Sequence, residues 1–235
     1  MRVSSAPRPG PRWSPIPAEL ADHLKALLHA LQGFSGLLRD NLDAGHWTQA
    51  HQNADQIDHA ARRMDVQVNA LSDLAAINAV PCRPTSLDMT ALTYAAWAAV
   101  AAGGAPPARV CAIDDPLPVA RADADLVLRL WRALLGNGHK FSARAAAPKV
   151  RVDALVDDRR TWYRVTDNGG GFDATRAVRL FMPFQRDHPA REFPGPGIGL
   201  SLAPRIVQRH GGDIRLRCQP GIGTVAEFTL QAPAA

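Results

Sequence analysis

The sequence predicts an α+β fold, in which an N-terminal helical hairpin is followed by an α/β sandwich with helices over one face of a sheet. Up to residue 80, apolar residues recur at the three- and four-residue steps of helices. After it, helical segments are mixed with the period-two alternation of strands. Between the two parts, residues 80–84 (VPCRP) form a natural linker because prolines end helices. We assign residues 1–16 to a poorly ordered tail, 17–80 to the hairpin and 81–235 to the sandwich.

Composition limits the class of protein and its location. The chain has 235 residues, of which 46% are hydrophobic, and this is enough for a buried core. It has no run of about 18 apolar residues that would predict a membrane span, and its start lacks the apolar segment of a signal peptide. The cysteines are far apart and form no metal-ligand pair, which favours a reducing, cytoplasmic location. The net charge is +5, but the basic residues are scattered, which argues against nucleic acid as a partner.

The first helix is predicted from about residue 17 by one apolar stripe at near-heptad spacing. A turn is expected between residues 41 and 47, where Gly45 lies. A second helix follows over about 48–78, with a weaker stripe. The first stripe is Leu20, Leu24, Leu27, Leu31, Phe34 and Leu38, and the second is Ile57, Ala61, Met64, Val68 and Leu71, with Leu74 as a further candidate.

A hairpin of two helices hides such stripes poorly by itself. Two copies would form a four-helix bundle, so we expect a homodimer through residues 17–80. The alternative is that the stripes pack on the rest of the same chain.

After the linker, helices and strands alternate irregularly, as in an α+β sandwich. The last helix should stop at Gly211-Gly212, because glycine takes the left-handed conformation that ends helices. Helices are predicted over 87–102, 124–137 and 200–210, and strands over 109–113, 150–156, 161–166, 214–218 and 224–230.

Three segments carry residues suited to binding a ligand. They are Leu134 to Phe141, which contains Asn137, then Asp167 to Phe172, and Gly195 to Leu200. Glycines let the backbone approach a ligand closely, and an aspartate offers a fixed acceptor. The glycines of the third segment open a helix whose N-terminal N–H groups favour phosphate. In this order and spacing, the three segments predict a pocket for ATP.

The same segments make the chain resemble the catalytic core of two-component sensor histidine kinases, over roughly residues 18–232. Residues 133–142 match the N box of that family, 167–172 its first glycine box, 181–186 its F box and 195–201 its second glycine box. Residues 205–212 and 223–228 continue the match. The resemblance implies a dimerisation and phosphoacceptor hairpin, followed by an ATP-binding domain of the histidine kinase, gyrase and chaperone type.

The resemblance also implies roles for individual residues. Asp167 would accept a hydrogen bond from the adenine amino group, Asn137 would ligate Mg²⁺ through its amide oxygen, and Lys140 would neutralise phosphate charge. Residues 173–198 would form a mobile lid that Phe181 and Phe184 anchor. The implied nucleotide-binding set is Asn137, Lys140, Asp167, Gly169, Gly171, Phe184, Gly195, Gly197, Gly199 and Leu200.

The chain departs from the family pattern at the phosphoacceptor. The best match to the family's H box places Asp22 where the histidine belongs and His23 where the acid belongs. One residue turns a side chain by about 100° around a helix, and phosphoryl transfer depends on positioning. His23 beside Asp22 is the candidate nucleophile, His29 is a second candidate, and a hairpin with no phosphorylated histidine is the third possibility.

Two further departures lie in the ATP-binding boxes. Ala133 stands one turn before Asn137, where related ATPases carry a glutamate that activates water, and a methyl group cannot act as a base. ATP hydrolysis is therefore disfavoured. Pro196 removes one backbone N–H from the second glycine box.

Three functions remain open from the sequence, of which the third is an inert adaptor that binds no nucleotide. The first is a cytosolic histidine kinase core that binds Mg-ATP, phosphorylates a histidine on the hairpin and passes the phosphoryl group to an aspartate of a response-regulator receiver domain. The second is a nucleotide-binding pseudokinase or scaffold that regulates a partner kinase or response regulator. The displaced histidine and Ala133 are the reasons for the second hypothesis.

Overall fold

The computed structural model of the chain describes residues 18–79, 81–102, 110–157, 160–172, 181 and 199–231. The chain divides into two compact units, of which the first ends at Ala75 and the second begins at Ala76.

The first unit is a helical hairpin. Helix α1 (Ala18–Asp43) and helix α2 (Trp47–Ala79) are joined by a tight turn at residues 44–46, in which Gly45 has a φ of 71°. The predicted α1 stripe is the covered side of this helix, with Leu27 buried and Leu24, Leu31, Phe34 and Leu38 half-buried. Because the side chain of Leu20 lies outside the described residues, that part of the stripe stays a prediction.

The predicted stripe of α2 is partly wrong. Ile57, Met64 and Leu71 are half-buried as expected, but Ala61 and Val68 are exposed. The buried positions between them are Ala60 and Gln67. The covered seam therefore runs through residues 57, 60, 64, 67 and 71, at steps of three and four. The pattern of apolar residues did not predict this seam, because the polar Gln67 occupies one of its positions.

The second unit is built on a five-stranded sheet of order β2-β4-β5-β7-β6. Its strands are β2 (Val110–Ile113), β4 (Lys149–Val156), β5 (Thr161–Asp167), β6 (Ile214–Gln219) and β7 (Gly223–Phe228). Strands β2 and β4 are parallel, and the other neighbours are antiparallel. A small antiparallel pair, β1 (Thr85–Leu87) with β3 (Ala120–Ala122), was not expected, because three-residue strands give no readable alternation.

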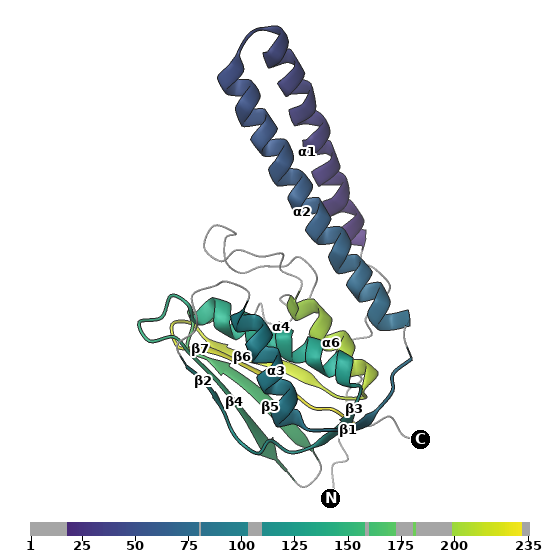
Figure 1. Cartoon of the computed structure of the whole chain (residues 1–235), viewed down its shortest axis with the longest axis vertical. Coiled ribbons are helices and arrows are strands. Elements are labelled where there is room, and N and C mark those ends of the chain that lie inside the picture. Colours follow the sequence, from purple (N-terminus) through teal and green to yellow (C-terminus); the bar gives the residue numbers. More distant parts are fainter. Residues whose placement is uncertain are drawn as a thin grey trace, which may run out of the picture. The chain divides into compact units, whose positions relative to one another are not determined.

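Three helices cover one face of this sheet, as the ribbon in Figure 1 shows. They are α3 (Met89–Ala101), α4 (Ala124–Ser142) and α6 (Gly199–Arg209), close to the predicted ranges. Trp131 of α4 is fully buried and meets Phe228 of β7 edge to face, with ring centroids 5.0 Å apart. The core lies between α4 and the sheet, so the predicted α+β sandwich is confirmed.

The linker is held to two helices by one buried histidine. The backbone N–H of Asp123 donates to Nε2 of His210 over 3.0 Å, and Cys82 Sγ lies 3.5 Å from the same nitrogen. Nε2 is therefore an acceptor, and Nδ1 carries the proton toward the Ile206 carbonyl, 2.7 Å away. Asp123 also caps α4 by accepting from Leu126 N, and it accepts from Arg83 N of the linker.

Candidate nucleotide-binding site

Asp167 is the last residue of β5, and its side chain lies on the helix side of the sheet. Side chains alternate along a strand, so Asp167 shares its face with the buried Tyr163 and Val165. Only 8% of Asp167 is exposed, and its Oδ1 accepts from Gly169 N over 2.9 Å. The carboxylate is thus fixed by its own turn.

Burial sets the protonation of this carboxyl group. Desolvation raises the pKa of Asp167 to about 6, while hydrogen bonds from the backbone N–H groups of Gly169 and Thr224 act in the opposite direction. Such a group is ionised at neutral pH but gains from a partner that donates a hydrogen bond to it. An exocyclic amino group of a base is a donor of this kind.

Asn137 and Lys140 lie near the C-terminal end of α4, both half-buried. This end of α4 approaches the turn after Asp167 very closely. A Cβ on Gly169 would lie 2.5 Å from the carbonyl oxygen of Phe141, the residue after Lys140. Only glycine allows this approach, so Gly169 brings the asparagine segment and the first glycine segment together, as the sequence predicted.

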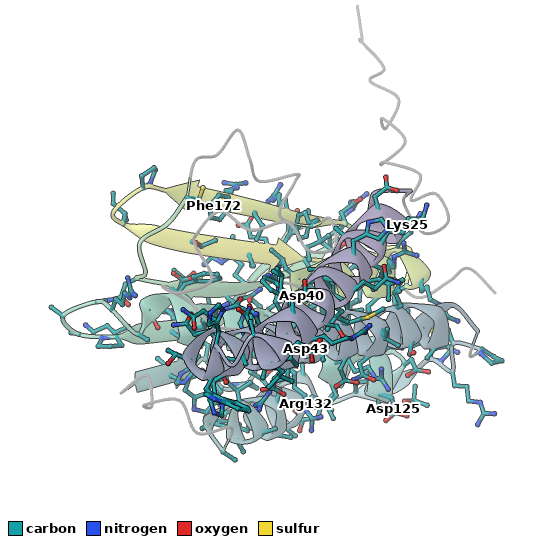
Figure 2. All side chains as sticks on the ribbon, turned by 90° about the horizontal axis from the view of Figure 1, so that it is seen from above. Lys25, Asp40, Asp43, Asp125, Arg132 and Phe172 are labelled. Atoms are coloured by element: carbon teal, nitrogen blue, oxygen red, sulfur yellow. The ribbon has the colours of Figure 1, made fainter. Side chains whose placement is uncertain are left out.

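The same turn is joined to neighbouring loops on two sides. Asn168 accepts from Lys149 N over 2.8 Å and donates to Ala147 O over 2.8 Å, which holds the loop after α4. Gly221 N donates to Gly170 O, also over 2.8 Å. Phe172, which lies beside the yellow strands in Figure 2, accepts from Cys218 Sγ through its carbonyl oxygen over 2.9 Å. Asn168 was not among the predicted site residues, although asparagine in a glycine-rich turn is a known signal for such bonds.

Gly223 is a second glycine that a close backbone contact requires. It was not among the predicted site residues. Its φ is 139°, and a Cβ there would overlap the carbonyl oxygen of Asp167 on the neighbouring strand. The close pairing of β7 with the end of β5 therefore requires glycine.

The second glycine segment is described only from its last glycine. Gly199 begins α6, Leu200 is half-buried against the core, and Ser201 is buried. Gly195, Gly197 and Phe184 lie outside the described residues, as does most of the predicted lid. Phe181 is described and is buried, with 8% exposed.

Two residues beside the asparagine differ in their surroundings. Ala133 is half-buried on α4, one turn before Asn137, and offers no acid or amide. His139 is buried and points into the core, where its ring meets Trp97 edge to face with centroids 5.5 Å apart. Burial lowers the pKa of His139, which keeps it neutral. Although His139 lies in the N box, its side chain packs α3 on α4.

The candidate phosphoacceptor lies in the other unit, on α1. Asp22 is exposed, and Lys25 lies 4.0 Å from its Oδ1, one turn along the helix. His29 is exposed as well. The backbone of His23 is helical, but its side chain lies outside the described residues, so its role stays a prediction.

The residues that are described fit a nucleotide. A fixed carboxylate and a turn of glycine backbone lie against the backbone of the C-terminal end of α4, and a Cβ at Gly170 would meet nothing within 4 Å. Within the described ranges no group of three or more His, Cys, Asp and Glu side chains gathers for a metal ion. Asn137 would therefore share Mg²⁺ with phosphate oxygens and water, as this ion often is in nucleotide sites.

Comparison with known proteins agrees with this geometry. Residues 122–234 match the family model of the histidine kinase-, DNA gyrase B- and HSP90-like ATPases. The methanogenesis regulatory histidine kinase FilI of Methanothrix harundinacea is 27% identical over 210 residues, which are 89% of this chain and 24% of FilI. Cyanobacterial phytochrome A of Nostoc is 34% identical over 116 residues, which are 49% of this chain and 15% of that protein.

Among solved structures, the Acinetobacter baumannii histidine kinase AdeS has the same fold. The TM-score is 0.57 at 16% identity, and the match covers 90% of this chain and 98% of AdeS. The mycobacterial sensor histidine kinase MprB matches with a TM-score of 0.51 at 23% identity, over 63% of this chain and 97% of that structure.

Residues 122–234 are thus an ATP-binding domain of the family that histidine kinases share with DNA gyrase B and HSP90. Together with the helical N-terminal region, this domain has the fold of the ATP-binding core of sensor histidine kinases and resembles it in sequence. The chain spans about a quarter or less of the length of the two curated relatives named above. In the part of the chain that the structure describes, no helix is long and apolar enough to cross a bilayer.

Proposed function

We propose that this chain is a cytoplasmic histidine kinase core, which transfers the γ-phosphoryl group of Mg-ATP to a histidine of its hairpin and then to a response-regulator aspartate. The observation that carries the proposal is the fixed, buried carboxylate of Asp167 facing the same turn as the asparagine end of α4. The match to the ATPase family and to histidine kinases supports it.

Each described residue would have a simple task. Asp167 would orient the adenine by accepting from its amino group, and Lys140 would offset phosphate charge. Asn137 would supply one oxygen ligand to Mg²⁺, which would neutralise charge on the phosphates when bound. During transfer the bond from the γ-phosphorus to its bridging oxygen breaks, a phosphorus–nitrogen bond forms, and the histidine N–H loses its proton. Asp22, next to His23, is the nearest acid in sequence to receive that proton.

We further propose that the hairpin dimerises. Several large apolar side chains of α1 and α2 remain exposed, which costs free energy in water and favours a second copy as a cover. They are Leu28, Leu37, Leu42, Trp47 and Val68, with 43%, 51%, 44%, 64% and 45% exposed. Sedimentation equilibrium of the chain would report a dimer, and a purely monomeric chain at high concentration would overturn this part.

The kinase proposal is tested by incubating the chain with γ-labelled ATP and Mg²⁺. We expect acid-labile, base-stable label on the protein, as for phosphohistidine, and its loss in His23→Ala but not in His29→Ala. Asp167→Asn should reduce labelling because nucleotide binding is weakened. Label that survives the loss of both histidines, or no label with ATP bound, contradicts the proposal.

A second function is favoured by the surroundings of Asn137. Ala133 presents a methyl group one turn before it, and the best match to the family's H box, which places Asp22 where the histidine belongs, points the same way. A chain with these changes could bind ATP and act as a regulatory pseudokinase. Calorimetry that shows tight ATP binding without any labelling would select this function over the kinase.

A further inference from the structure

The face of the five-stranded sheet opposite the helices is unusually rich in paired charges. Because side chains alternate along strands, the positions between the buried ones point to this open face. It carries five cations and three carboxylates among the described residues. The cations are Lys149, Arg151, Arg164, Arg215 and Arg217, and the carboxylates are Asp114, Asp153 and Glu227.

Two buried carboxylates hold the arginines in place. Asp153, with 7% exposed, accepts from Arg164 Nε over 2.5 Å and lies 3.2 Å from Arg151 Nε. Glu227, with 3% exposed, accepts from Arg215 Nε over 2.5 Å and lies 3.2 Å from Arg217 Nε. The guanidinium groups are thus fixed before any ligand arrives, which lowers the entropy lost on binding.

One end of this face is hollowed into a basic pocket of about 430 Å³. Lys149, Arg151 and Arg217 line it, with Thr166, Ile222 and Val225 among the other lining residues. An arginine has five N–H donors, and only Nε of Arg217 has an ion-pair partner in the described part of the chain. Lys149 Nζ has none there. The pocket therefore presents two guanidinium groups held by carboxylates, and one ammonium group, with N–H donors left for a ligand.

The other end of the face is apolar. Leu155 is 48% exposed and stands opposite Trp162 in the β4–β5 register. Arg215 lies over the ring of Trp162, with Cζ 3.9 Å from the centroid, so that the ring is fixed. From Arg151 to Leu155 is four residues along β4, or roughly 13 Å at the usual rise of a strand.

We propose that this open face is a docking surface for an extended, acidic segment of a partner protein, with carboxylates in the basic pocket and an apolar side chain on Trp162 and Leu155. Positions i, i+2 and i+4 of an extended segment face one side and span this distance. Tryptophan and arginine are the residues that most often dominate binding at interfaces. The proposal does not rest on the kinase activity.

Charge argues against a second copy of the chain as the occupant. Each face has five cations and three carboxylates, so two such faces would bring two net positive charges against two, and like charges at an interface are costly. A small anion would satisfy the pocket but leave Trp162 and Leu155 uncovered. An acidic segment with an apolar residue would place carboxylates in the basic pocket and cover Trp162 and Leu155.

The test uses the full chain and the peptide Glu-Ser-Glu-Ser-Leu-Ser-Glu-Ser-Glu, which reads the same in both directions. Binding is followed by NMR at the indole N–H of Trp162, assigned with Trp162→Phe. We expect this signal to shift, and the affinity to fall with added salt. A peptide with glutamine in place of glutamate should not bind.

A matched pair of double variants tests the location. Lys149→Gln with Arg217→Gln should weaken binding about tenfold, since two charge contacts are lost. Arg121→Gln with Arg132→Gln removes the same charge from other exposed positions, Arg132 being on α4 (Figure 2), and should change binding less than about twofold. Thermal unfolding of both double variants checks that the fold is retained, which we expect for the first pair because Glu227 keeps its hydrogen bond from Arg215.

Four results would overturn the proposal. They are no peptide binding at millimolar concentration, equal weakening in both double variants, a response of these residues to tripolyphosphate but not to the peptide, and self-association of the chain that the Lys149 and Arg217 changes abolish. The third result would make the pocket a small-anion site, and the fourth would make the face an interface between copies.

Discussion

The hairpin and the sandwich differ in how their glycines and apolar residues are used. In α1, a Cβ added at Gly33 or Gly36 would meet nothing within 4 Å. In the sandwich, a Cβ at Gly169 or Gly223 would collide with the backbone of a neighbouring element. The buried side chains follow the same division, since most of them belong to one core around Trp131 in the sandwich, whereas several large apolar residues of the hairpin stay exposed.

This difference indicates which contacts determine the structure of each unit. The ATP-binding sandwich is defined by its own close contacts, so its motifs can be read residue by residue. The hairpin is defined by its apolar stripes, and the contacts within the hairpin bury these stripes only in part. Its function therefore depends on what covers it, which we propose to be a second copy.

The largest expected change in stability comes from replacing a glycine by alanine, and we expect opposite signs in the sandwich and in the hairpin. Gly223→Ala should destabilise the sandwich by about 3 kcal/mol or more, because it combines a φ of 139° with a collision against Asp167. Gly33→Ala should stabilise the hairpin by about 1 kcal/mol, because alanine is the better helix residue and the space is open. Urea unfolding followed by near-UV and far-UV circular dichroism measures both. Similar effects at the two sites would break the contrast.

A smaller difference is expected between the two aspartates that cap helices in the sandwich. Asp123→Ala should cost about 2 kcal/mol and Asp88→Ala about 1 kcal/mol. Asp123 accepts from both Leu126 N and Arg83 N, whereas Asp88 accepts from Ala91 N. The thermal unfolding midpoints of the two variants, at equal protein concentration, report the difference. Equal losses would show that the linker contact of Asp123 adds nothing.

The contribution of Asp123 to the stability of the fold depends on pH in a direction that follows from the shift of its pKa. Burial raises the pKa of Asp123, but hydrogen bonds from the N–H groups of Arg83, Leu126 and Asp125 outweigh it and lower the pKa overall. The contribution is therefore present above the ordinary pKa of about 4 and is lost as the pH falls below it.

The smallest effect is expected in the seam of the hairpin. Gln67 is buried, and its Oε1 has no hydrogen-bond partner among the described residues. Gln67→Leu should stabilise the hairpin by about 1 kcal/mol, because an unsatisfied polar atom is removed. Gln32→Leu, at an exposed position of α1, should change stability by less than about 0.5 kcal/mol. An unstable Gln67→Leu variant would instead show that the glutamine is satisfied in the assembled protein.

The sequence predicted the elements of the sandwich well because their signals are local. The alternating pattern before Asp167 predicts the strand that ends there. The glycine at position 211 predicts the left-handed conformation that follows α6. The β1–β3 pair was missed because three-residue strands give no readable alternation, and the α2 seam was missed because the polar Gln67 occupies one of its positions. His139 shows a further limit, since its motif position did not reveal that it faces Trp97.

Within the candidate site, the residues that we propose to bind a ligand carry a clearer sequence signal than the residues that hold them in place. Asp167 and Asn137 stand in recognisable segments. Gly223 and Asn168 act through contacts to other strands and loops, and these contacts follow only from the sheet order. The basic pocket has no motif, because Lys149, Arg151 and Arg217 become neighbours only when β4, β5, β7 and β6 pair.

The most direct test of the nucleotide site is the binding of adenosine, which carries no phosphate, measured by calorimetry from pH 5 to 7.5. Because the pKa of Asp167 is raised to about 6 and the ionised carboxylate is the stronger acceptor, affinity should increase through pH 6 and then level off. Asp167→Asn should bind about tenfold to a hundredfold more weakly at pH 7.5, without this pH dependence. Asp125→Asn, at an exposed position of α4 (Figure 2), should behave as the unchanged chain. Adenosine binding that is independent of pH in the unchanged chain, or unaffected by Asp167→Asn, would contradict the account.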